Sequence, residues 1–222
     1  MRTSADEGVV SAYFDERVLD AAAAGSLTSL LDRVEREPVE CLVLRFADGT
    51  GAFPAPERRY LARWDEILAR LARLPAKTIA AYAGRTGTAA IHLGLVTDLR
   101  VAAAEARLVL DGGRFPGLAA YWLPKFVGLG TARRLTLLGA DLTAAEAARM
   151  GLIDVVDDTA EAAVTATIKA LAPVTPEAVR YTRRLLDDSY LLERGAAHDL
   201  TKAARFQVGI GAGEGVGQWP RP

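Results

Sequence analysis

The sequence predicts an α/β fold, and three observations support this prediction. Residues Val39–Phe46 form a nearly continuous apolar run of strand length, which is typical of a strand covered on both faces. Residues Tyr60–Leu74 place apolar side chains at helical spacing, opposite a face of arginines and acids. A glycine-bearing turn, Gly84–Thr88, joins an apolar strand-like run at Thr78–Ala83 to a run of small helix-forming residues at Ala89–Val96. Strands and helices therefore alternate along the first half of the chain.

The remaining elements follow from the same periodicities. We expect a strand at 9–14, a helix at 19–35 that Pro38 ends, short strands at 99–103 and 107–110, and a mostly helical region from 119 onward. Thr143–Glu146 has the sequence of a capping box, and Gly151 is expected to end that helix in a left-handed conformation. A further helix is expected to begin at Thr175–Pro176.

Composition excludes several classes of function. The chain has 222 residues, enough for one sizeable hydrophobic core, and a formal net charge of -1 at pH 7. Its basic residues are interspersed on presumed helix faces, so we expect no nucleic-acid partner. The single cysteine, Cys41, lies in a predicted buried strand and indicates a reducing compartment. The amino-terminal segment is acidic and lacks a central apolar block, so we expect a cytoplasmic protein without a signal peptide or a membrane span.

The turn at Gly84–Thr88 is the candidate active site. A strand that ends in glycine and continues as a helix directs unpaired amide groups and the positive end of a helix dipole toward one point, which suits a developing oxyanion. Two loops that end predicted strands, Ala47–Pro56 and Asp111–Gly117, could form two sides of a pocket beside it. The alternative is that this turn serves only packing, as many strand-to-helix glycines do.

Beyond these patterns, the residues from Ile79 to Val156 resemble the crotonase (enoyl-CoA hydratase/isomerase) superfamily. The resemblance is carried by Ile79–Gly84, Asp98–Ala102, Val127–Ala132, Leu137–Ala140, Ala144–Ala147 and Gly151–Val156, in this order. A weaker likeness relates Ala52–Glu57 to an oxyanion loop of the family. Within the superfamily, Trp64–Leu68 and Leu74–Ala80 are most similar to the short crotonase subunits of the dihydroxyphenylglycine pathway of peptide antibiotics.

The resemblance implies a crotonase-like spiral of ββα units over residues 1–157 and a C-terminal helical oligomerisation region over 158–222, assembled as a homotrimer or hexamer. It also implies an acyl thioester of coenzyme A or of a carrier protein as the substrate, with no separate cofactor. Two backbone amides would bind the thioester carbonyl, and by position these belong to Glu57 and Ala90. Pro56 departs from the family pattern, because proline replaces the usual glycine, lacks an N–H and restricts its neighbour.

Hydratases of this family place two glutamates over the reacting double bond, and neither is present in this sequence. His92 occupies the first of these positions, and Gly112 falls at the second, with Asp111 one residue earlier. One interpretation is that a buried, neutral His92 moves protons with Asp111 as its partner. The other is that His92 is a packed structural residue. With two histidines and one cysteine in the chain, we expect no metal site.

Two functions from different classes remain open at this point. The first is an acyl-CoA hydratase or dehydratase, a lyase that stabilises an enolate in an oxyanion hole, in the formation of an aromatic polyketide or of dihydroxyphenylacetyl-CoA. The second is a catalytically reduced subunit with the same fold, which activates a partner such as a type III polyketide synthase.

Overall fold

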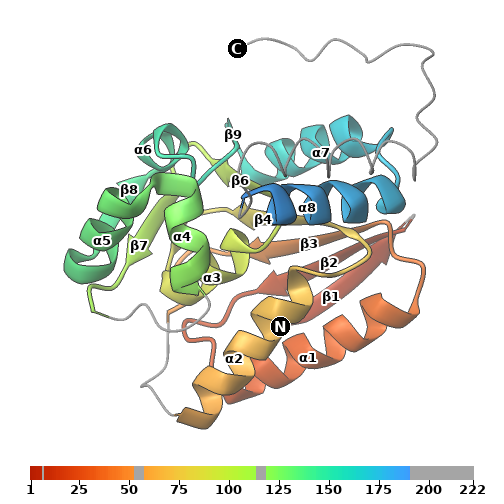
Figure 1. Ribbon diagram of the computed structural model, residues 1–222, viewed down its shortest axis with the longest axis horizontal. Helices are drawn as coiled ribbons and strands as arrows, with labels where there is room; N and C mark the ends of the chain where they lie inside the picture. Colours follow the sequence, from red (N-terminus) through yellow and green to blue (C-terminus); the bar gives the residue numbers. More distant parts are fainter. Residues whose placement is uncertain (7, 53–57, 114–118, 191–222) are drawn as a thin grey trace. The chain divides into compact units, whose positions relative to one another are not determined.

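The computed structural model describes residues 1–6, 8–52, 58–113 and 119–190 (Figure 1). Internal contacts divide the chain into two units, Met1–Pro176 and Glu177–Pro222. The first unit holds all the described strands and seven of the described helices, and the second holds most of α8 (Pro176–Tyr190). Helix α8 begins at the predicted proline. The predicted boundary after residue 157 stays a prediction.

Strands and helices alternate through the first unit, which confirms the predicted α/β class. The described strands are β1 (Arg2–Asp6), β2 (Val9–Phe14), β3 (Cys41–Phe46), β4 (Lys77–Tyr82), β5 (Arg85–Thr86), β6 (Leu99–Ala103), β7 (Arg107–Leu110), β8 (Ala140–Thr143) and β9 (Val155–Asp157). The described helices of this unit are α1 (Ala21–Arg36), α2 (Arg58–Leu71), α3 (Thr88–Leu95), α4 (Ala119–Val127), α5 (Leu129–Leu138), α6 (Ala144–Arg149) and α7 (Ala160–Leu171).

The strands form two sheets. The larger sheet has the order β1-β2-β3-β4-β6-β9, and all of its neighbouring pairs are parallel except β1 and β2. The smaller sheet has the order β5-β7-β8, with β5 parallel to β7 and β7 antiparallel to β8. Parallel neighbours require crossover connections, and the helices between the strands supply them.

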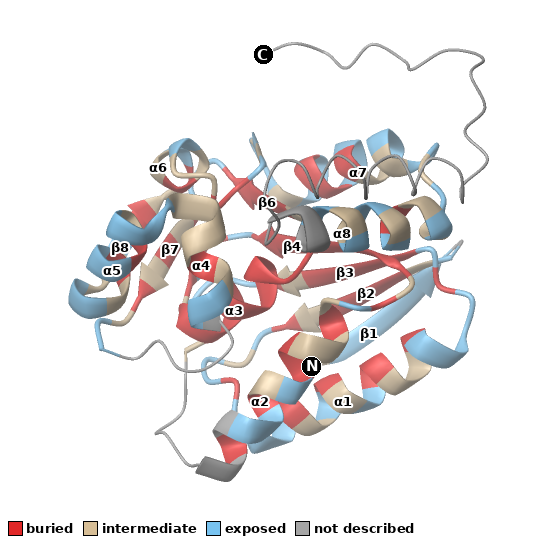
Figure 2. Ribbon diagram, in the orientation of Figure 1, coloured by how far each residue is buried: buried red, intermediate tan, exposed pale blue. Residues whose placement is uncertain are grey.

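The large sheet is covered on both faces, as the apolar run at Val39–Phe46 predicts (Figure 2). On one face, Leu42 and Leu44 join a core that includes buried residues of α1, α2 and α3. On the other face, Cys41 and Val43 join a smaller core with α7. Burial raises the pKa of the Cys41 thiol to about 12, so the thiol stays protonated and unreactive at neutral pH.

Local signals of the sequence specify several ends of elements. Thr143 and Glu146 form the predicted capping box at the start of α6, with both reciprocal hydrogen bonds present. Gly151, two residues after α6, has the predicted left-handed conformation, with φ at 84°. The strands that the sequence did not predict include β1, which is polar, β5, which lies within the predicted turn at Gly84–Thr88, and β8, which directly precedes the capping box.

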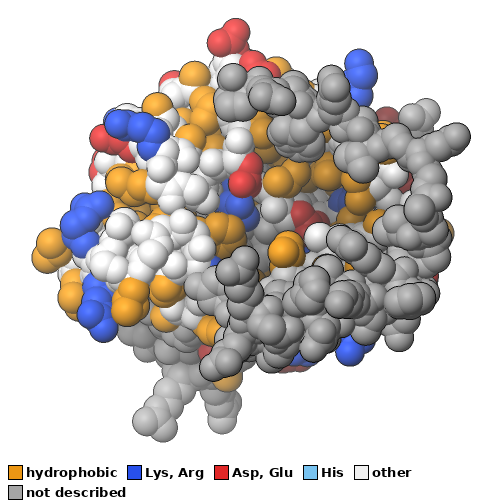
Figure 3. Space-filling view, turned by 45° about the horizontal axis from the view of Figure 1, so that its top comes forward, with side chains coloured by type: hydrophobic (Ala, Val, Ile, Leu, Met, Phe, Trp, Pro, Cys, Tyr) orange, Lys and Arg blue, Asp and Glu red, His pale blue; other side chains and the backbone are white. Residues whose placement is uncertain are grey.

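The surface gives two further observations. Among the described residues, no helix is both long enough and apolar enough to cross a bilayer. On the face shown in Figure 3, the described lysines and arginines stand in small separate groups among apolar and neutral side chains.

Candidate active site

The amino end of α3 packs directly against the loop that follows β3. Gly87, the residue before the helix, donates its N–H to the carbonyl oxygen of Thr50 at 2.8 Å. A Cβ atom on Gly87 would approach the Gly51 backbone to 2.8 Å, and a Cβ atom on Gly51 would approach Ala90 Cβ to 2.4 Å. The two glycines therefore permit a contact between backbones, which holds this loop at the positive end of the helix.

Ala90, one of the two predicted oxyanion donors, is fully buried at this contact. Its N–H donates to the Gly51 carbonyl oxygen at 3.3 Å, and the Ala89 N–H donates to the same oxygen at 2.8 Å. Because normal N–H···O distances are about 2.7 to 3.2 Å, the Ala90 amide is the more weakly held of the two.

The other predicted donor, Glu57, lies outside the described residues, and so does Pro56. Ala52 is the last described residue before them. Its N–H donates to the Arg17 carbonyl oxygen at 2.9 Å, and its own carbonyl oxygen accepts from the Leu19 N–H at 3.0 Å. The structure therefore fixes the point at which the chain enters the predicted oxyanion loop.

Asp111, the predicted proton-transfer partner, follows the end of β7 and is half-buried. Its backbone N–H donates to Thr88 Oγ1 at 2.8 Å, and that hydroxyl donates to the Val109 carbonyl oxygen at 3.3 Å. Thr88 is the first residue of α3. One buried threonine thus ties the end of β7 to the amino end of the helix, and Asp111 lies beside that end.

Gly112, at the second of the two glutamate positions, serves packing. A Cβ atom there would approach the Leu138 carbonyl carbon to 2.8 Å and the Gly139 nitrogen to 3.0 Å. The neighbouring Gly113 donates its N–H to the Thr136 carbonyl oxygen at 2.7 Å. The loop after β7 is therefore held against the end of α5, with no room for a side chain at Gly112.

His92 lies one turn into α3 and is completely buried. Burial lowers the pKa of the imidazole to about 3, because the apolar surroundings disfavour the charged form. The imidazole is therefore neutral at pH 7. A base with so low a pKa accepts protons weakly at neutral pH, since efficient general bases have pKa values near the working pH.

The structure brings His92 and Asp111 to the same side of α3. Thr88 and His92 are four residues apart in one helix, so their side chains lie on one face, and Asp111 is hydrogen-bonded to Thr88. Sequence reasoning missed both Thr88 and Gly51. The only local signals were a threonine at a helix start and a glycine in a loop rich in turn formers, and neither reveals its distant partner.

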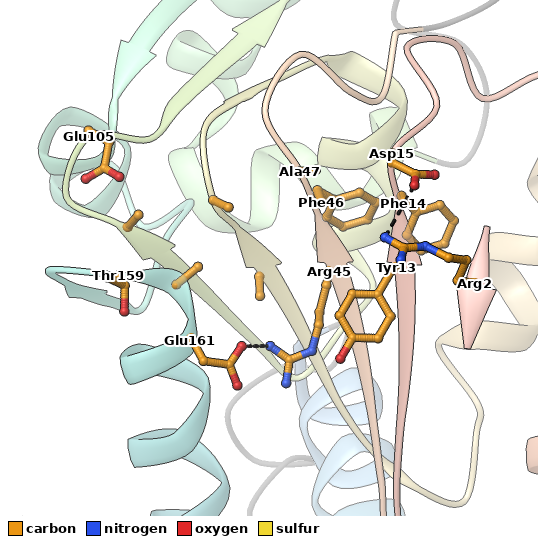
Figure 4. A pocket seen from close by; sticks show the side chains of 14 residues that line it. Arg2, Tyr13, Phe14, Asp15, Arg45, Phe46, Ala47, Glu105, Thr159 and Glu161 are labelled. Carbon is orange, nitrogen blue, oxygen red and sulfur yellow. Dashed lines mark hydrogen bonds and ion pairs between the residues drawn. The ribbon is translucent and has the colours of Figure 1, made fainter. Parts of the chain in front are cut away.

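Two cavities lie along the large sheet. One, of about 330 Å³, opens at the carboxyl ends of the strands and is lined by residues that include Tyr13, Arg45, Ala81, Ala103 and Glu161 (Figure 4). Another, of about 410 Å³, borders the first beside Tyr13 and Arg45. Neither cavity is lined by Ala90, His92 or Asp111.

Comparison with known families decides the classification. Residues 46–203 match the sequence profile of the enoyl-CoA hydratase/isomerase family. This chain belongs to that family. The matched residues include Ala90 and His92 of α3, and Asp111 directly after β7. The predicted crotonase membership is confirmed, and acyl-CoA chemistry is the chemistry of the family.

One relative of this family member is similar to it in sequence over part of its length. The 1,2-epoxyphenylacetyl-CoA isomerase of Escherichia coli (strain K12) is 33% identical over 155 residues, which cover 60% of this chain and 58% of that protein. The chain thus spans less than two thirds of the length of that relative.

Solved structures confirm the predicted crotonase fold with helices in its C-terminal region. The enoyl-CoA hydratase of Thermoplasma volcanium GSS1 matches with a TM-score of 0.84 and 19% identity, over 93% of this chain and 90% of that one. The enoyl-CoA hydratase of Bacillus anthracis matches with a TM-score of 0.81 and 22% identity, over 94% of this chain and 91% of that one. At these identities the likeness establishes the fold alone.

The candidate site of this hydratase/isomerase family member offers backbone amides and a carboxylate. Among the described residues, no group of three or more histidines, cysteines, aspartates or glutamates is arranged to hold a metal ion. In the described part of the site, the Ala89 and Ala90 amides donate to Gly51, and Asp111 follows β7 beside the amino end of the helix.

Proposed function

We propose that this chain is an acyl-CoA hydratase or dehydratase that stabilises an enolate at the amino end of α3. The family match supports an acyl-CoA substrate. The observation on which the proposal depends is the 2.8 Å hydrogen bond from the Asp111 N–H to Thr88 Oγ1. This bond sets a carboxylate-bearing residue beside the helix end at which amides would polarise the thioester carbonyl.

Each residue has a role in this proposal. The Ala90 amide, together with the amide of Glu57, would bind the thioester oxygen. In a dehydration, Asp111 would take the proton from the α carbon, and the electron pair of that C–H bond would form the enolate. The β hydroxyl would then leave as water, carrying the proton that Asp111 returns, and the enolate electrons would form the new double bond. Neutral His92 would lie on the same face of α3 as Thr88, the residue to which the Asp111 backbone is bonded.

The proposed substrate is a polyketide-like or aromatic acyl thioester, as in the formation of dihydroxyphenylacetyl-CoA. The support for this class is the resemblance of Trp64–Leu68 and Leu74–Ala80 to the subunits of that pathway. Assembly as a homotrimer or hexamer is a further part of the proposal, which the family resemblance supports. Location in the cytoplasm is another, which the single cysteine, Cys41, supports.

One observation favours a second function, that of a catalytically reduced subunit which activates a partner such as a type III polyketide synthase. His92 stands at the position of one catalytic glutamate, yet it is completely buried and its pKa is lowered to about 3. Gly112 stands at the other position and has no side chain. A chain that has lost both acids could retain the fold while serving a partner enzyme.

Assays of the purified chain separate the two functions. The first predicts that the chain alone hydrates crotonyl-CoA or dehydrates a 3-hydroxyacyl-CoA, and that Asp111→Asn lowers kcat by about 100-fold or more. The matched control is Asp141→Asn, which removes an exposed carboxylate paired with arginines on β5 and β7 and should leave the rate unchanged. Inactivity alone, with increased turnover of an added type III polyketide synthase, would support the second function. If the chain is inactive alone and also does not increase the turnover of the synthase, both functions are excluded.

A further inference from the structure

Strand β1 (Arg2–Asp6) ends the large sheet on one side. It pairs with β2 in antiparallel fashion, from Arg2 opposite Tyr13 to Asp6 opposite Val9. No described strand pairs with its other edge, and all five of its residues are exposed. An edge of this kind presents backbone N–H and C=O groups that can pair with a further strand.

The charges of β1 are arranged for pairing with a copy of itself. The strand reads Arg-Thr-Ser-Ala-Asp, with Ser4 at its centre. If two copies pair antiparallel about Ser4, Arg2 of each lies opposite the partner's Asp6, and Thr3 lies opposite the partner's Ala5. Opposite charges directly across an antiparallel pair stabilise it, and like charges destabilise it. A parallel alignment in the same register would instead set arginine against arginine and aspartate against aspartate.

The strand at the other end of the sheet lacks this property. β9 (Val155–Asp157) reads Val-Val-Asp, and antiparallel pairing about Val156 would set Val155 opposite the partner's Asp157. That arrangement gives no charge complementarity. The usual protection of an edge strand is a charge that would repel a second copy, and β1 instead carries one charge of each sign at equal distances from its centre.

The two charged side chains of β1 are accessible. Arg2 is 76% exposed, and its guanidinium lies 3.4 Å from the Asp15 carboxylate, which is itself 52% exposed. It also lies 5.9 Å from the centroid of the Tyr13 ring (Figure 4). An ion pair this exposed contributes little to stability, so Arg2 can exchange Asp15 for another carboxylate at small cost. Asp6 is exposed and lies on the same face of the strand as Arg2.

We propose that β1 is a docking edge for a second copy of this chain, which pairs with it antiparallel about Ser4 and joins the two large sheets into one. A contact of five residues on each side is small, so the association is weak, depends on protein concentration and decreases with added salt. The contact is two-fold, so two copies, or two assemblies whose β1 edges face one another, associate into one of twice the mass.

Charge exchange tests this proposal. Sedimentation velocity of the full chain at increasing concentrations should show a mass that doubles. R2D alone sets acid against acid at both ends of the pairing, and D6R alone sets arginine against arginine. Each should weaken the doubling step by about tenfold or more. An equal mixture of the two variants should restore it, because an acid then faces an arginine at both ends.

The control is R134D, which makes the same charge change at an exposed position on α5 and should leave the doubling unchanged. Thermal melting of each variant checks that the fold is intact, and the mixture itself tests whether the separate variants remain competent to pair. Three results would each overturn the proposal: a mass that does not change with concentration, doubling that survives both single variants, or a mixture that fails to restore it.

Discussion

Gly51 carries the contact between the loop after β3 and α3, and the substitution Gly51→Ala tests that contact. The φ angle of Gly51 is +83°, and a Cβ atom there would lie 2.4 Å from Ala90 Cβ and 3.2 Å from the Ala90 nitrogen. Neither atom is the movable end of a flexible side chain. Either the loop or the helix therefore has to shift.

The expected loss of stability in Gly51→Ala has two parts. An alanine held in the left-handed region costs about 1–2 kcal/mol. Overpacking of a close contact adds about 1–3 kcal/mol. We therefore expect Gly51→Ala to lower the free energy of unfolding by about 2–5 kcal/mol. In a protein of this size each kcal/mol lowers Tm by roughly 2–4 °C, so the expected decrease in Tm is about 4–20 °C.

Thermal and denaturant unfolding of Gly51→Ala should be compared with those of Gly49→Ala. Gly49 has a similar φ of +73°, but no atom lies within 4 Å of the position of its Cβ. Gly49→Ala therefore measures the backbone cost alone, about 1–2 kcal/mol. If the two variants have the same free energy of unfolding, the close packing of Gly51 on Ala90 does not exist in solution.

Three further predictions concern the buried groups and a helix cap. Burial lowers the pKa of His92 to about 3, whereas the imidazole takes up a proton near pH 6.5 in the unfolded chain. The stability contributed by neutral His92 is therefore present above about pH 6.5 and is lost as the pH falls toward 3. Between pH 7 and pH 5 the wild type should lose about 2 kcal/mol more than His92→Gln, and equal losses in denaturant unfolding would contradict this. Asp154→Ala should cost about 3–5 kcal/mol, because it removes the carboxylate 2.7 Å from the guanidinium of Arg100, whose side chain is 5% exposed. Asp141→Ala, in an exposed pair, should cost less than about 1 kcal/mol, and equal costs in the same unfolding assay would show that burial of the pair does not matter. Thr143→Ala removes the capping box of α6 and should cost about 1 kcal/mol, so an unchanged Tm would show that this cap contributes nothing.

The buried elements of the fold could be predicted from the sequence because burial leaves a pattern. β2 and β6 have the predicted bounds, and β3 and β4 lie within a residue or two of theirs, since strands covered on both faces need continuous apolar residues. β1 could not be predicted this way. Its five residues are polar or small and exposed, so it is held in the sheet by backbone pairing with β2, which hydropathy does not record.

The candidate site could be predicted only in part. The strand, the glycine turn and the helix α3 are local features of the sequence, and they predicted the amino end of α3 to within one residue. The contacts that shape the site join residues far apart in the chain, such as Gly51 with Ala90 and Thr88 with Asp111. No local pattern encodes these pairs. The complete burial of His92 likewise depends on the elements packed around α3, so its lowered pKa could be stated only from the structure.

A crystal structure with a bound acyl-CoA tests the central claim most directly. The account predicts a thioester oxygen about 2.7 to 3.1 Å from the Ala90 nitrogen, in place of the 3.3 Å hydrogen bond to Gly51, with the Asp111 carboxylate near the α carbon. A thioester bound elsewhere, for example in the 330 Å³ cavity on the α7 face, with the Ala90 amide still bonded to Gly51, would contradict it.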